Sequence, residues 1–101
     1  MLEKHLVKHI LEYLRGIGAY AGKIKTTGRW DTKRRCFIKD PMLFKGVPDL
    51  LCFHKKRMFF IEVKTTTDQT DFQILFERLC REAGVNYILA YSVGDVEKII
   101  N

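Results

Sequence analysis

Two apolar segments separated by a short polar run constrain the fold of this chain more than any other feature. Residues 49–53 (DLLCF) and 58–65 (MFFIEVKT) are rich in aromatic and branched side chains and flank residues 54–57 (HKKR). Segments of this kind around a polar turn are typical of a β-hairpin. A two-residue turn centred on Lys55 and Lys56 places Asp49 directly across from Glu62 on the neighbouring strand.

This pairing gathers ionisable groups in a segment that otherwise has the composition of a buried strand. The two-residue period of a strand puts Lys64 on the same face as Glu62. Opposed like charges destabilise a sheet, and Asp is a poor strand former. Mg²⁺ or Mn²⁺, which prefer hard oxygen ligands, would explain the arrangement. The alternative is that Asp49 only closes a turn after Pro48, while Glu62 and Lys64 form a solvated pair.

The remaining segments predict an α/β fold. A helical period runs from Leu2 to Ile17, a second helix begins at Thr70 and ends before Gly84, and residues 86–92 suit a strand. We expect one domain over residues 1–101, with helices flanking a mixed sheet. Two further expectations are a strand within residues 19–25 and a mobile basic loop over residues 26–36. In a last helix capped by Ser92, we expect Val96, Ile99 and Ile100 to face inward.

Composition narrows the class of partner and the compartment. Lys and Arg number 18 against 12 Asp and Glu, a net charge of +6 that favours a polyanion, with nucleic acid first. Cys36, Cys52 and Cys80 show neither a disulfide framework nor zinc-ligand spacing, so we expect core or near-core residues. The chain contains no apolar run of membrane-spanning length, and we expect no signal peptide. We therefore expect an intracellular protein, cytoplasmic or nucleoid-associated, that does not bind a membrane.

The hairpin and its flanks also resemble a known family. Gly46-Val47-Pro48-Asp49 followed by Glu62-Val63-Lys64 is similar to the PD-(D/E)xK nuclease signature. Gln73-x-x-Phe76 and Ser92-Val93-x-Asp95-Val96 extend the resemblance to the virus-type replication-repair nuclease domain, VRR-NUC, over nearly the whole chain. The resemblance implies a restriction-endonuclease-like core in a small stand-alone form, with a phage or bacterial origin.

The resemblance also implies a role for each matching residue. Asp49 and Glu62 would ligate Mg²⁺ or Mn²⁺, the Val63 carbonyl would be a third ligand candidate, and Lys64 would act on the attacking water. Gln73 matches a glutamine that supports the site from the next helix. Its alternative role is purely local, because Thr70 and Gln73 have the spacing of a capping box.

Two glutamates compete for a further catalytic role in the first helix. At about 100° per residue, Glu3 falls within the arc of the apolar stripe, whereas Glu12 lies on the opposite face. We therefore expect Glu3 to point toward the site. The alternative for Glu3 is a carboxylate at a helix start, where the macrodipole favours it.

A basic segment, residues 23–39, precedes the hairpin, and Asp31 is its single acidic residue. Contact with DNA phosphates explains such a segment better than a solvated face, because it includes Trp30 and leads into the predicted site. Lys45 is a second phosphate candidate, next to the predicted metal ligand. The residues expected to bind DNA are Lys23, Lys25, Arg29, Arg34, Arg35 and Lys45. His5 and His9 have metal-ligand spacing but no third ligand, so we expect no metal there.

These inferences predict an endodeoxyribonuclease that depends on Mg²⁺ or Mn²⁺ and hydrolyses phosphodiester bonds. The resemblance further implies selectivity for branched DNA such as Holliday junctions, and a homodimer. The best interface candidates are Met42, Leu43 and Phe44, three apolar residues close to the predicted site. The main alternative is a non-catalytic nucleic-acid-binding module that uses the basic loop. A small protein-interaction subunit is a third possibility.

Overall fold

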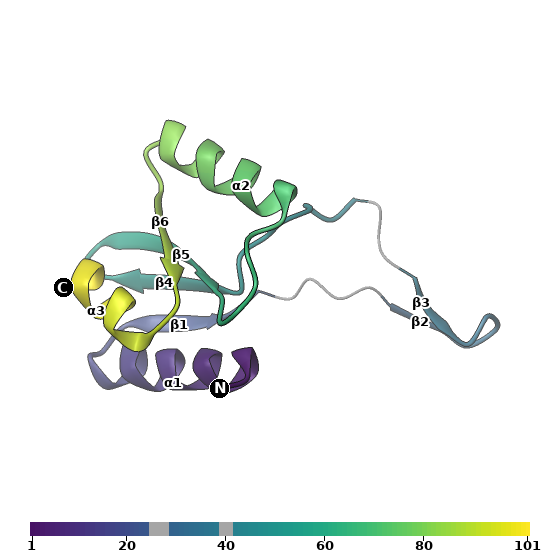
Figure 1. The fold of residues 1–101 in the computed structure, drawn as a ribbon, viewed down its shortest axis with the longest axis horizontal. Coiled ribbons are helices and arrows are strands. Elements are labelled where there is room, and N and C mark those ends of the chain that lie inside the picture. Colours follow the sequence, from purple (N-terminus) through teal and green to yellow (C-terminus); the bar gives the residue numbers. More distant parts are fainter. Residues whose placement is uncertain (25–28, 39–41) are drawn as a thin grey trace.

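The computed structural model describes residues 1–24, 29–38 and 42–101, and these form a mixed sheet flanked by helices (Figure 1). The strand order is β1–β4–β5–β6, with β1, β4 and β5 antiparallel and β6 parallel to β5. The predicted α/β class is therefore confirmed. The strands of the sheet are β1 (Tyr20–Lys23), β4 (Leu50–His54), β5 (Arg57–Val63) and β6 (Asn86–Ala90). The helices are α1 (Glu3–Gly16), α2 (Asp71–Glu82) and α3 (Val93–Ile100).

The central hairpin has the predicted register. Leu50 pairs with Ile61 and His54 pairs with Arg57, as a turn centred on the two lysines requires. Lys55 and Lys56 both have positive φ, at 50° and 65°, the conformation that joins twisted antiparallel strands through a two-residue loop. The register places the position of Asp49 one step beyond the last pair, opposite Glu62.

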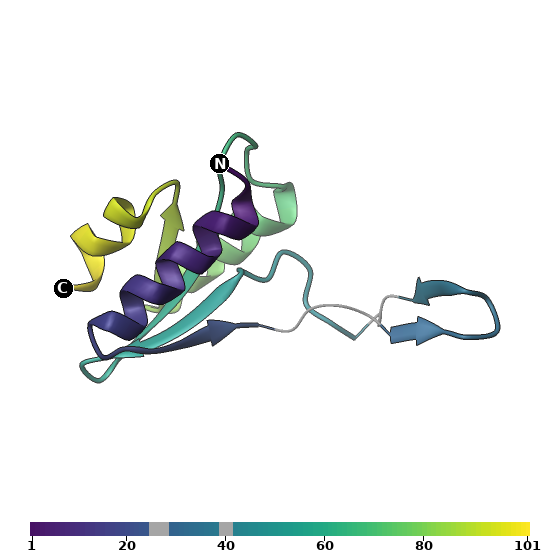
Figure 2. The same ribbon diagram turned by 90° about the horizontal axis from the view of Figure 1, so that it is seen from below.

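The hydrophobic core lies between the sheet and the layer formed by α1 and α3 (Figures 1 and 2). α1 buries the apolar stripe that its sequence predicts, and α2 covers part of the other face of the sheet. Val96 and Ile100 are fully buried as expected, but the inward position predicted for Ile99 is wrong, since 49% of it is exposed. α3 packs against α1 and β6, and its buried residues are Val96 and Ile100.

The basic segment before β4 differs most from its sequence prediction, which was a mobile loop over residues 26–36. Residues 29–38 form a second hairpin of β2 (Arg29–Asp31) and β3 (Cys36–Ile38), not an irregular loop. The Asp31 carboxylate accepts hydrogen bonds from the backbone N–H groups of Lys33 and Arg34, at 2.9 and 3.2 Å, which folds the turn. The sequence did not predict this short hairpin, because its many charged residues leave no alternating pattern of apolar and polar side chains.

The β2–β3 hairpin projects away from the rest of the molecule (Figures 1 and 2). The molecule is accordingly elongated, with extents of 48, 29 and 27 Å. Cys36 lies in this hairpin and is exposed, so the core position expected for it is wrong; Cys52 and Cys80 are buried as expected. None of the helices in the described part of the chain is long and apolar enough to cross a membrane.

Candidate active site

Three carboxylates from three different elements converge at one end of the sheet. Glu3 at the start of α1, Asp49 just before β4 and Glu62 in β5 each offer an oxygen within 4.8 Å of the others. Glu12, the competing acid of α1, is exposed on the other face of the helix. The helical period therefore distinguishes the two glutamates correctly: only Glu3 lies beside the acids of the hairpin.

Asp49 is fixed from both of its neighbouring strands. Its Oδ2 accepts a hydrogen bond of 2.8 Å from the backbone N–H of Val63, and its carbonyl accepts one of 3.1 Å from Ile24. Pro48 beside it is buried. The Asp49 carboxylate is thus held across the hairpin, which contradicts the alternative in which it only closes a turn after Pro48.

Glu62 is a buried acid whose two carboxylate oxygens differ in their hydrogen bonding. Only 2% of the residue is exposed; its Oε1 accepts a hydrogen bond of 3.1 Å from Nε2 of Gln73, whereas its Oε2 has no partner among the described residues. Burial, followed by the negative charge of Asp49, raises the pKa of Glu62 to about 8. Lys64, 7% exposed, opposes this shift. The solvated pair considered for Glu62 and Lys64 is therefore wrong.

The donor set fits a divalent cation of the Mg²⁺ class. Carboxylate oxygens are the ligands that such ions prefer, and Glu3, Asp49 and Glu62 supply three. A buried oxygen without a partner costs about 1–3 kcal/mol, and a cation would remove that cost at Glu62 Oε2. The backbone carbonyl of Val63 is the other ligand candidate from the sequence. The Val63 side chain is buried, and its backbone N–H donates a hydrogen bond to Asp49.

Gln73 makes hydrogen bonds both to Thr70 and to Glu62. Its side-chain oxygen accepts from the Thr70 N–H at 2.8 Å, and its backbone N–H donates to the Thr70 hydroxyl at 3.3 Å, which completes the capping box. Its Nε2 donates to Glu62 at the same time. The two ends of one amide therefore connect the start of α2 to the candidate metal ligand.

Gly46 is a positioning residue that sequence reasoning did not single out. It has a φ of +76°, and a Cβ added there would overlap the backbone carbonyl of Phe72 and the N–H of Gln73. The turn that leads to Asp49 thus packs directly on the first turn of α2. The signal for it was the glycine of the Gly46-Val47-Pro48-Asp49 motif itself.

The predicted DNA-binding residues occupy three separate places. Lys23 lines a hollow of about 360 Å³ together with Glu3 and Asp49. Lys45 is exposed, with its Nζ 4.9 Å from the centre of the Phe72 ring at the start of α2. In the projecting hairpin, Arg34 and Arg35 are exposed in the turn and Arg29 contributes backbone to β2. The last predicted residue, Lys25, lies outside the described residues.

The chain was compared with known proteins at three levels. No protein-family model matches it, and no curated protein does. Among solved structures, one named "VRR_NUC domain" matches at a TM-score of 0.70 and 25% sequence identity, over 97% of this chain and 92% of that chain.

Proposed function

We propose that this chain, which is a VRR-NUC domain, is an endodeoxyribonuclease that hydrolyses phosphodiester bonds with the help of Mg²⁺ or Mn²⁺. One observation carries the proposal: Glu3, Asp49 and Glu62 converge, and the buried Oε2 of Glu62 has no partner in the described chain. Folding alone leaves this arrangement unexplained, because like charges brought together in a poorly solvated place destabilise a protein.

In this proposal, Glu3, Asp49 and Glu62 hold the cation, and the Val63 carbonyl is a further ligand candidate. When bound, a divalent cation supplies positive charge that stabilises the negative charge developing on phosphate. Lys64 lies within electrostatic reach of Glu62, where its ammonium group orients the attacking water or neutralises a phosphate oxygen. Gln73 keeps the Glu62 carboxylate in place through its hydrogen bond.

We further propose that the substrate is branched DNA, such as a Holliday junction, and that the working unit is a homodimer. Lys23 is well placed to contact the phosphates next to the cleaved bond, since it borders the same hollow as Glu3 and Asp49. Two copies would present two such sites to one junction. Uncovered apolar residues on α2 and at 42–44 support a contact between copies.

The test is cleavage of linear, flapped and four-way DNA, with and without Mg²⁺ or Mn²⁺. We expect metal-dependent cutting by the wild-type protein, strongest on the branched substrates. Asp49→Asn should abolish cutting and keep the fold, because asparagine retains an oxygen for the Val63 N–H but lacks the charge.

Two variants of one helix provide a matched comparison. Glu3→Gln should lower the cleavage rate by at least about 100-fold, whereas Glu12→Gln, on the exposed face of α1, should leave it unchanged. DNA binding without any metal-dependent cleavage would contradict the nuclease proposal and favour the non-catalytic binding module.

A further inference from the structure

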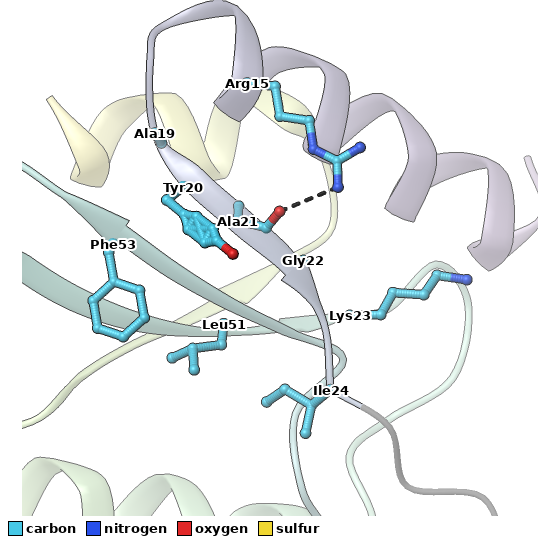
Figure 3. Close-up of a pocket in the computed structure, with 9 residues that line it drawn as sticks. All are labelled: Arg15, Ala19, Tyr20, Ala21, Gly22, Lys23, Ile24, Leu51 and Phe53. Atoms are coloured by element: carbon cyan, nitrogen blue, oxygen red, sulfur yellow. Dashed lines mark hydrogen bonds between the residues drawn. The ribbon is translucent and has the colours of Figure 1, made fainter.

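The face of the sheet formed by β1 and β4 contains a hollow (Figure 3), and none of the three carboxylates is among the residues that line it. Tyr20 and Phe53 are cross-strand partners there, 75% and 51% exposed, and Leu51 continues the same face along β4. α2 packs against β6, at the opposite edge of the sheet from β1, and leaves these aromatic residues uncovered. The hollow has a volume of about 720 Å³.

Gly22 creates the space at the centre of this hollow. It pairs with Leu51 in the sheet, and a Cβ added to it would meet no atom within 4 Å. Its backbone conformation does not require glycine, because it lies in a strand without positive φ. Glycine inside a strand weakens it and often marks a close approach by a ligand. Figure 3 shows the Tyr20 ring along β1 with its hydroxyl toward this gap.

The rim of the hollow is positively charged. Arg15 reaches the outer edge of β1 and donates a hydrogen bond of 3.2 Å to the Ala21 carbonyl, and Lys23 follows on the same strand (Figure 3). No acidic side chain is among the residues that line the hollow. A polyanion fits this rim, whereas a second copy of the same face would bring like charges together around a two-fold axis.

The hollow adjoins the candidate active site. Lys23 and Ile24 line it and also line the smaller hollow that contains Glu3 and Asp49. A ligand lying along β1 would therefore pass from the two aromatic side chains, over Gly22, to the carboxylates.

We propose that the β1–β4 face binds unpaired nucleotides of a single DNA strand that leads into the active site. Bases stack on exposed aromatic rings in proteins that bind single strands, while cationic side chains follow the phosphates. Bases in a duplex already stack on each other, so Tyr20 and Phe53 select a strand that has separated, as at a branch or a flap. The inference rests on the proposed nuclease function for its biological meaning, but its test measures binding alone.

The experiment measures the affinity of fluorescent oligo-deoxythymidine by anisotropy, with divalent ions removed so that cleavage plays no part. Tyr20→Ala and Phe53→Ala should each weaken binding about 5- to 100-fold, the range expected when one stacked base is lost. Gly22→Val should weaken it similarly by filling the gap, without loss of thermal stability, since valine suits a strand and meets no atom there. Tyr91→Ala is the matched control: it is 47% exposed and follows β6, at the opposite edge of the sheet.

The outcomes separate this inference from the nuclease proposal. Unchanged affinity for the single strand in Tyr20→Ala, Phe53→Ala and Gly22→Val would overturn the binding face, whether or not the protein cuts DNA. If those variants instead lower the mass of a dimer and leave the affinity unchanged, the face belongs to a contact between copies and the inference is wrong. Loss of affinity in a protein that never cleaves DNA would support the binding face and contradict only the nuclease.

Discussion

At the scale of single residues, Glu62 links folding to the proposed chemistry. It is buried at the end of a paired strand, next to a second acid, and one of its oxygens has no partner in the described chain. Burial favours its neutral form, and so does the charge of Asp49. A residue of this kind stabilises the folded state only while it carries a proton or, as we propose, a cation.

The raised pKa of Glu62 predicts a specific pH dependence of stability. Between its ordinary pKa of 4.5 and about 8, the folded state binds one more proton than the unfolded state. The free energy of unfolding therefore falls as pH rises through this window, by at most about 1.4 kcal/mol per pH unit from this group. Glu62→Gln should remove that part of the slope and stabilise the metal-free protein at pH 8, as measured by urea unfolding across the window.

An exposed acid provides the control for this prediction. Glu12→Gln should keep the wild-type slope, because Glu12 lies on the solvated face of α1. Parallel slopes for wild type and Glu62→Gln would show that Glu62 titrates normally. Added Mg²⁺ should stabilise the wild-type protein more at pH 8 than at pH 6, since the cation competes with the proton.

Gly46 gives a second prediction at this scale. Gly46→Ala should destabilise the protein, because alanine there combines an unfavourable φ with overlap of the α2 backbone. Gly18→Ala is a matched control with a φ of +86° and no atom within 4 Å of the added Cβ. We expect Gly46→Ala to lose roughly 1–3 kcal/mol more than Gly18→Ala in urea unfolding. Equal losses would mean that the contact between this turn and α2 is not close in solution.

At the scale of elements, the two hairpins differ in their position in the molecule and in the charge of the residues they carry. The β4–β5 hairpin carries Asp49 and Glu62 at its base and is central to the sheet. The β2–β3 hairpin projects from the molecule (Figure 2). It carries consecutive basic residues in a turn organised by Asp31. Its ion pair between Arg34 and Asp31, at 3.9 Å, is exposed on the arginine side and adds little stability.

The basic turn predicts a salt-dependent contribution to DNA affinity. Arg34→Gln with Arg35→Gln should weaken duplex binding for all sequences and flatten the slope of log K against log salt by up to roughly two. Lys55→Gln with Lys56→Gln, two adjacent cations in the turn of the other hairpin, should change the slope less. Filter binding over a range of salt concentrations provides the measurement. Equal slopes for the two double variants would indicate that the projecting turn makes no special phosphate contact.

At the scale of the whole molecule, α2 leaves an apolar surface uncovered. Phe72, Leu75 and Leu79 lie on one stripe and are 50%, 39% and 51% exposed, although such a stripe usually faces a core. Leu43 and Phe44 adjoin them, and the Phe44 ring lies 6.4 Å from that of Phe76. A second copy that covers this surface would explain why α2 carries it.

This surface predicts the oligomeric state. Sedimentation equilibrium at micromolar concentration should give about twice the chain mass of 11.9 kDa, and Phe44→Asp should lower it. Ile74→Asp is the matched control, because Ile74 is 52% exposed but lies on the other side of α2. A monomeric wild-type protein with full activity on four-way junctions would refute the dimer and leave the carboxylate site unaffected.

The sequence by itself determined the features that depend on neighbours within a few residues. A two-residue turn fixes the register that sets Asp49 against Glu62, and the helical period turns Glu3 toward the sheet and Glu12 away from it. Thr70 and Gln73 likewise form their capping box within a single turn of helix. Each of these follows from local backbone geometry, which the order of residues specifies directly.

Only the tertiary structure decided which surfaces are covered and which segments meet. The stripe of α2 has the pattern of a core helix, yet no element of the described chain packs over Phe72 and Leu79. The close approach of Gly46 to α2, the second role of Gln73 and the hollow beside Gly22 also depend on segments distant in sequence. The physical reason is that burial and contact are properties of the assembled layers, whereas periodicity records only which residues share one face.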